Sequence, residues 1–184
     1  MRTLTRRALL AVATAVAGAL ALSAATQDAP AGDALAKLSY PRTIVLVRHA
    51  EKAEAPKDDP NLTEAGAARA QRLSQMFGKS GVSHVFASEF QSTQQTVAAL
   101  SVAAGVQVQI VPARSTDALL SALDSLPRSA IAVVAGHSNT LPALIERLTG
   151  GQTKVKIADD EFDRLFVVTQ WGPGKESRAI ELRY

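Results

Sequence analysis

Runs of apolar residues alternate with helical patterns over most of the chain. Residues 43–47 form a largely β-branched run without polar alternation, which is typical of a strand buried on both faces of a sheet. Similar runs predict further strands at 82–87, 106–111 and 130–135. Between them, apolar side chains at helical spacing predict four helices. The first is capped by Thr63, the second covers 93–104, the third begins at Ser115 or Thr116, and the fourth covers 139–148.

Four successive strand–helix units predict an α/β fold with three layers, a mostly parallel sheet covered by helices on both faces. The pattern changes near the end of the chain, where 154–157, 164–169 and 178–183 read as strands with little helix between them. We expect these strands to extend the sheet at one edge, with Trp171 and the turn at 172–174 forming an edge hairpin.

The first 25 residues predict a cleaved signal peptide. A basic start with Arg6 and Arg7 precedes an apolar stretch, and small residues at 23–25 suit a signal peptidase. An uncleaved membrane anchor is the alternative, and the paired arginines leave both the general and the twin-arginine export routes open. We therefore expect a periplasmic or secreted protein without stable membrane insertion after cleavage, a tether over 26–41, and one domain over 42–184.

Composition narrows the possible functions. The 184 residues carry a formal charge of +3, but the leader holds three arginines and no acidic residue, so the remainder is neutral. Neutrality and only five Phe, two Tyr and one Trp disfavour a nucleic-acid partner, which needs excess cations and stacking rings. The absence of Cys excludes disulfides, thiolate zinc sites and a cysteine nucleophile. The pattern gives no indication of oligomeric state.

Two of the three histidines directly follow predicted strands. His49 lies after the first strand and next to Arg48, and His137 lies after the fourth strand, ahead of the helix that begins at Asn139. Because the carboxyl ends of parallel strands lie at the same edge of a sheet, we expect both histidines at that edge, where ligands bind. A neutral imidazole, a guanidinium fork and a helix N-terminus together indicate a pocket for a phosphoryl group. The third histidine, His84, lies within a strand and is expected to be structural.

Four motifs in order carry a family resemblance: Val-Arg-His-Ala-Glu-Lys at 47–52, Leu-Thr-Glu-Ala-Gly at 62–66, Ser88 through Gln-Thr at 95–96, and Gly-His-Ser-Asn-Thr at 136–140. This pattern resembles the histidine phosphatase superfamily, also called phosphoglycerate mutase-like, from about residue 43 to the last residue. The resemblance implies that His49 attacks phosphorus and becomes a phosphohistidine, that Arg48 holds the phosphoryl oxygens, and that His137 stabilises the charge of transfer. It also implies that no metal or other cofactor is needed.

The chain departs from the family pattern at position 92, where the family carries a second pocket arginine and this chain has Ser92. A transition-state arginine can change a rate by about 10³–10⁵. Lys52, in the first motif, or Arg114 could supply the missing charge, and Lys52 is the better candidate. We expect the phosphate pocket to comprise Arg48, His49, Lys52, Ser92, His137 and Asn139.

The proton donor for the leaving alcohol is open among Glu51, Asp117 and Glu89. Asp117 also suits a structural role in the first turn of its helix. The acidic run 159–161 is expected to be a solvated loop, with a metal or substrate rim as the alternative. Two hypotheses follow. The first is an exported phosphatase acting on a small phosphomonoester through His49. The second is a degenerate, non-catalytic protein that binds phosphate or a phosphorylated ligand, because Ser92 replaces the arginine.

Overall fold

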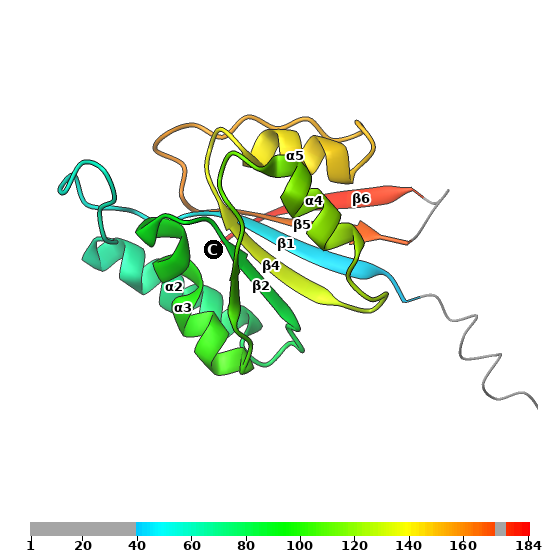
Figure 1. Cartoon of the computed structure of the whole chain (residues 1–184), viewed down its shortest axis with the longest axis horizontal. Helices are drawn as coiled ribbons and strands as arrows, with labels where there is room; N and C mark the ends of the chain where they lie inside the picture. The colour runs from blue at the N-terminus through cyan, green and yellow to red at the C-terminus, as the bar shows by residue number, and fades with distance from the viewer. Residues whose placement is uncertain (1–39, 172–175) are drawn as a thin grey trace, which may run out of the picture.

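A computed structural model describes residues 40–171 and 176–184. The predicted signal peptide (1–25), nearly all of the predicted tether and the turn at 172–174 lie outside the described residues. Figure 1 shows a central sheet with helices on both sides. The elements are, in chain order, β1 (Arg42–Arg48), α2 (Glu64–Phe77), β2 (His84–Ala87), α3 (Gln91–Ala104), β3 (Val108–Ile110), α4 (Thr116–Asp124), β4 (Ile131–Gly136), α5 (Leu141–Leu148), β5 (Arg164–Gln170) and β6 (Ser177–Arg183).

The six strands are ordered β3-β2-β4-β1-β5-β6. β1, β2, β3 and β4 are mutually parallel where they pair, whereas β5 pairs antiparallel with both β1 and β6. The predictions of a mostly parallel sheet and of late strands that extend it at one edge are confirmed. The strand direction changes at β5, which runs antiparallel to its neighbour β1. The segment between α5 and β5 contains no further helix.

The helices cover the two faces of the sheet in pairs (Figure 1). Alternate residues of β1 point to opposite faces: Val45 and Val47 pack with Leu73 of α2 and Leu100 of α3, whereas Ile44 and Leu46 pack with α4 and α5. This burial on both sides explains why the β1 sequence is continuously apolar. The three-layer α/β/α prediction is therefore confirmed.

Some predicted boundaries were wrong. Residues 154–157 form no strand; Val155 and Ile157 pack instead against the apolar cluster under α4 and α5. β3 is only three residues long, α3 begins two residues before the predicted position, and α5 begins two residues after it. The earlier start of α3 places Ser92 in the first turn of that helix.

Thr63 caps α2 as predicted: its Oγ1 accepts a hydrogen bond from Gly66 N–H at 3.1 Å. The four parallel strands all end at the same edge of the sheet, and β5 begins there because it runs in the opposite direction. Loops from five strands therefore meet at this edge. Among the described residues, no helix is long and apolar enough to cross a membrane.

Candidate active site

The two predicted site histidines lie together. Arg48 at the end of β1 is in register with Gly136 at the end of β4, and His49 N–H donates to the Gly136 carbonyl at 2.8 Å. The two chains therefore leave the sheet side by side. The imidazole rings of His49 and His137 lie 5.4 Å apart between centroids, with 59° between their planes.

The main chain orients the His49 ring. Its Nδ1 lies 2.9 Å from the Ala50 carbonyl oxygen, and because that oxygen can only accept a hydrogen bond, Nδ1 carries the proton. The neutral ring therefore has its lone pair on Nε2. Burial, with a smaller contribution from the charges of Arg48, His137 and Lys52, lowers the pKa of His49 to about 4 despite the opposing bond to Ala50. At pH 7 the His49 ring is therefore neutral, and its Nε2 lone pair is available to act as a nucleophile.

Arg48 is buried and held by a loop that lies far away in the sequence. Its Nη1 donates to the carbonyl oxygens of Ala158 and Asp159, both at 2.9 Å, and more weakly to that of Glu161 at 3.3 Å. Its Nε is also buried but has no hydrogen-bond partner within the described part of the chain. One side of the guanidinium is therefore anchored, while the Nε donor is unused.

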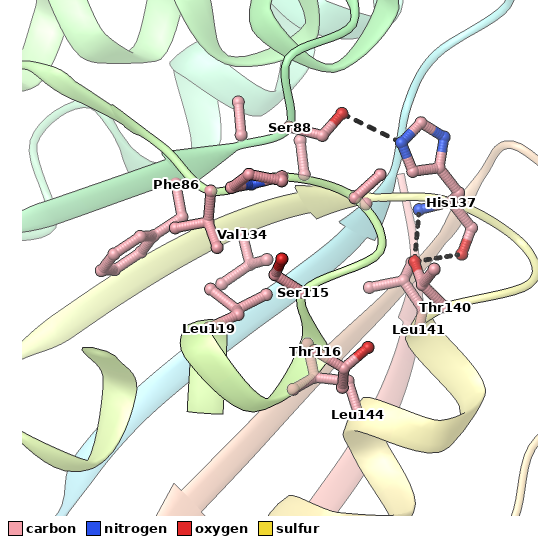
Figure 2. A pocket seen from close by; sticks show the side chains of 16 residues that line it. Phe86, Ser88, Ser115, Thr116, Leu119, Val134, His137, Thr140, Leu141 and Leu144 are labelled. Atoms are coloured by element: carbon pink, nitrogen blue, oxygen red, sulfur yellow. Dashed lines mark hydrogen bonds between the residues drawn. The ribbon is translucent and has the colours of Figure 1, made fainter. Parts of the chain in front are cut away.

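His137 is fixed by the segment that follows β2. Figure 2 shows the Ser88 hydroxyl against the ring, with Ser88 Oγ 3.0 Å from His137 Nε2. Ser88 Oγ lies 2.8 Å from Thr93 Oγ1, which itself donates to the Phe90 carbonyl. The Phe90 ring meets the imidazole edge-on, with 5.5 Å between centroids. Burial lowers the pKa of His137, with Glu89 opposing this and Lys52 and Arg48 adding to it, which favours the neutral ring.

Two hollows meet at His137 and Phe90. One cavity of about 130 Å³ is lined by Lys52, Asp58, Asp59, Pro60, Phe90, Ser92 and His137. The other, about 470 Å³, is lined by Glu89, Phe90, Ala113, Arg114, Thr116, His137, Asn139 and Thr140. A third and smaller space of about 30 Å³, drawn in Figure 2, is mainly apolar and lies behind His137 between the sheet and the first turns of α4 and α5. His137 lines both of the first two hollows, whereas Arg48 and His49 line neither of them and lie beside His137 instead.

Lys52 and Ser92 line the same small cavity, although 40 residues of sequence separate them. Ser92 is buried, and Lys52 is exposed and makes no ion pair among the described residues. Arg114 and Asn139 lie in the larger cavity instead. The structure therefore brings Lys52, and not Arg114, to the position where the arginine is missing.

The three candidate proton donors are separated. Arg69 binds both carboxylate oxygens of Glu51 and thereby lowers the pKa of that carboxyl, which is the opposite of what a proton donor needs. Asp117 pairs with Arg147 on α5 and lies on neither described cavity. Glu89 lines the larger cavity beside His137, where its Oε2 accepts the Ala113 N–H at 2.7 Å. Of these three candidates, Glu89 is the one that lines a described cavity together with His137.

Several residues at the site had not been singled out from the sequence. Arg69 lies on α2 outside the four motifs, and Phe162 directly follows the acidic run. Phe90 and Thr93 lie in the sequence between the motif residues Ser88 and Gln95. The acidic run is more than a solvated loop, since its carbonyls hold Arg48. His84 pairs with Ser83 at the opposite end of β2. Within residues 40–171 and 176–184, no group of three or more His, Cys, Asp or Glu side chains could hold a metal ion.

Comparisons with known proteins agree with this geometry. Residues 44–113, which include His49 and Ser92, match the family model of the histidine phosphatase superfamily (branch 1). No curated protein matches the chain significantly.

Solved structures share the fold. The protein histidine phosphatase SixA in complex with tungstate aligns with a TM-score of 0.65 at 16% identity, over 77% of this chain and 96% of that one. A candidate phosphohistidine phosphatase SixA from Nakamurella multipartitia aligns at 0.60 and 23% identity, over 78% and 96%. A mycobacterial glucosyl-3-phosphoglycerate phosphatase aligns at 0.57 and 13% identity, over 78% and 98%. The chain thus has the fold of these solved phosphatases, and its residues 44–113, which contain the first histidine motif, match the histidine phosphatase superfamily (branch 1).

Proposed function

We propose that this protein is an exported phosphatase that hydrolyses a small phosphomonoester through a phosphohistidine at His49, without a metal ion. One observation carries the proposal: a neutral His49, with its lone pair on Nε2, lies 5.4 Å from His137 and directly follows Arg48, whose buried Nε donor has no partner among the described residues. An unused buried donor beside a nucleophile suits a phosphoryl oxygen.

The reaction has two steps. In the first, His49 Nε2 attacks phosphorus, an N–P bond forms, and the bond from phosphorus to the alcohol oxygen breaks, leaving its electron pair on that oxygen. In the second, water gives a proton to the Glu89 carboxylate and attacks phosphorus, and the N–P bond breaks with its electron pair returning to Nε2, which regenerates neutral His49 and releases inorganic phosphate. Arg48 and His137 donate hydrogen bonds to the phosphoryl oxygens as charge develops.

Glu89 supplies the proton that the leaving alcohol needs. It lines the larger cavity with His137, whereas Glu51 and Asp117 are paired with arginines. Its Oε2 is held by the Ala113 N–H, so the other carboxyl oxygen is the one that faces a substrate. We expect Glu89→Gln to slow substrates with poor leaving groups more than aryl phosphates, because an aryl oxide leaves without a strong acid.

Lys52 supplies the second cation of the pocket. It shares the small cavity with Ser92 and His137, and no carboxylate among the described residues neutralises it through an ion pair. An ammonium is a point charge and cannot bind two oxygens in the planar manner of a guanidinium. We therefore expect slower turnover than an arginine at position 92 would support.

A degenerate, non-catalytic phosphate-binding protein is the second candidate, and Ser92 favours it. A buried hydroxyl at this position keeps the pocket polar but contributes no charge. Under this alternative, Arg48, His49 and His137 bind a phosphorylated ligand without turnover.

The test is phosphate release from an aryl phosphate by the purified protein and by its His49→Ala and Ser92→Arg variants. Activity that disappears in His49→Ala supports the phosphatase, and an acid-labile phosphohistidine at His49 should be trapped by rapid quenching. A silent parent with an active Ser92→Arg variant supports the degenerate protein. Silence of all three with such substrates contradicts the catalytic proposal. Export, which rests on the residue 1–25 leader, is tested separately by fractionating cells that express the full chain.

A further inference from the structure

Phe162 covers the Arg48 guanidinium. The Cζ atom of Arg48 lies 4.1 Å from the centroid of the Phe162 ring, and that ring is 5.9 Å from the ring of His49. Phe162 is half-buried and belongs to neither apolar cluster of the core. Its contacts are therefore with the site rather than with the packing of the fold.

The segment before Phe162 holds the same guanidinium from its edge. The carbonyls of Ala158, Asp159 and Glu161 accept from Nη1. Glu161 closes the loop, since its Oε2 accepts the Ala158 N–H at 2.9 Å and pairs with Arg164 on β5 at 3.1 Å. Arg164 is bound in turn to Glu181 on β6. The loop is thus fastened to the antiparallel hairpin and can serve as a rigid support.

These contacts restrict Arg48 in complementary directions. The carbonyls fix one edge of the guanidinium, and an aromatic face fixes its plane and keeps water from that face. The Nε donor is then left in one orientation, buried and without a partner in the described chain. A donor ordered before the ligand arrives binds a phosphoryl oxygen without losing side-chain freedom at that moment.

We propose that Phe162 is a positioning residue, which orients Arg48 for the phosphoryl group through the face of its ring. The inference rests on the proposed function, because it assigns the Arg48 Nε donor to a phosphoryl oxygen. Phe162 itself touches neither the phosphorus nor the leaving group in this assignment.

The test measures binding of inorganic phosphate by calorimetry to the protein and to Phe162→Tyr, Phe162→Leu and Phe162→Ala. Tyr keeps an aromatic face, Leu keeps apolar bulk without one, and Ala removes both. We expect Tyr to bind like the parent and both Leu and Ala to bind about tenfold more weakly. Phe77→Leu is the matched control, because Phe77 is also partly buried but packs against the core under α2, and it should leave phosphate binding unchanged. If Phe162→Leu binds phosphate as tightly as Phe162→Tyr, the ring face has no role and the inference is overturned.

A second readout needs no ligand and no turnover. The Arg48 Nε–H should give a slowly exchanging ¹⁵N resonance in the parent, Phe162→Tyr and Phe77→Leu, and should exchange rapidly in Phe162→Leu and Phe162→Ala. Unchanged exchange in the latter two also overturns the inference. A parent that binds phosphate but does not turn over contradicts only the catalytic part of the proposed function. A parent that binds no phosphate overturns the phosphate pocket, and with it the assignment of Phe162 to phosphoryl binding, whatever the resonance shows.

Discussion

The rings of His49 and His137 lie 5.4 Å apart because their strands end in register, with Arg48 opposite Gly136. This arrangement keeps two imidazoles close together inside a buried site. Burial lowers the pKa of both rings, so both are held neutral near pH 7. The histidines should therefore influence stability in acid as well as chemistry.

We predict that His49 makes the protein lose stability between pH 6.5 and 4. Burial lowers the pKa of His49 to about 4 from 6.5, so the unfolded chain takes up a proton in this window and the folded chain does not. The free energy of unfolding should fall by about 3 kcal/mol across the window from this residue. The measurement is urea unfolding at a series of pH values.

The comparison for this prediction is His49→Gln, which keeps a hydrogen-bond donor toward the Ala50 carbonyl but does not titrate. Its free energy of unfolding should depend less on pH between 6.5 and 4 than that of the parent. Parallel curves for the two proteins would show that His49 has an ordinary pKa in the folded state.

Glu51 and Arg69 should stabilise the first motif rather than act on the substrate. Arg69 donates to both Glu51 oxygens and, at 2.6 Å, to the main-chain oxygen of Tyr184. The pair is largely shielded from water, so removing one partner leaves the other unmatched. We expect Arg69→Ala to lower the free energy of unfolding by about 2–3 kcal/mol, less than the roughly 3–5 kcal/mol of a fully buried pair, because the Glu51 side chain is 24% exposed.

A double-mutant cycle with Glu51→Gln, Arg69→Ala and the double variant isolates the pair, with an expected coupling of about 1–3 kcal/mol. Glu51→Gln should also retain aryl phosphatase turnover per folded molecule. Additive effects of the two single changes, or a loss of turnover that exceeds the loss of folded protein, would contradict the structural role of Glu51.

The sequence was sufficient to predict the parallel core and the two histidines, and physical reasons separate these from what it could not predict. Strands buried on both faces have a continuous apolar signature, and residues that follow parallel strands must share an edge. The roles of Glu51 and Phe162 had no such signature. Their partners, Arg69 and Arg48, lie 18 and 114 residues away in the numbering, so only tertiary packing brings each pair together. Residues 154–157 were wrongly predicted to form a strand, because alternating apolar residues are expected both in a strand and in an extended segment that packs against helices.

Gly66 allows α2 to approach the first motif, and Gly66→Ala should therefore displace that motif. A Cβ at this position would lie 2.1 Å from the Glu51 carbonyl oxygen, which is main chain and cannot rotate away. We expect a loss of about 2–4 kcal/mol in the free energy of unfolding, in the range of severe steric substitutions, together with weaker phosphate binding.

Gly105→Ala is the control for this substitution. No atom lies within 4 Å of the Cβ it would add, and only its φ of +67° is unfavourable. It should cost about 1 kcal/mol and leave phosphate binding intact. If Gly66→Ala is no more destabilising than Gly105→Ala, the close approach of α2 to Glu51 is not a constraint on the fold.

Two Ser–His pairs at opposite ends of β2 allow the last prediction to be matched closely. Ser88 Oγ lies 3.0 Å from His137 Nε2 at the site, and Ser83 Oγ lies 2.9 Å from His84 Nδ1 at the other end of the strand. Ser88→Ala removes the hydroxyl that orients His137, so we expect turnover of an aryl phosphate to fall about tenfold, the value of roughly one hydrogen bond. Ser83→Ala should change turnover by less than about twofold, because its surface pair contributes only to stability. Steady-state kinetics of the two variants decides the matter. Equal effects would mean that Ser88 supports the strand rather than the orientation of His137. An unchanged Ser88→Ala would mean that the Phe90 ring, together with the Thr140 hydroxyl on the His137 main chain, is enough to position His137.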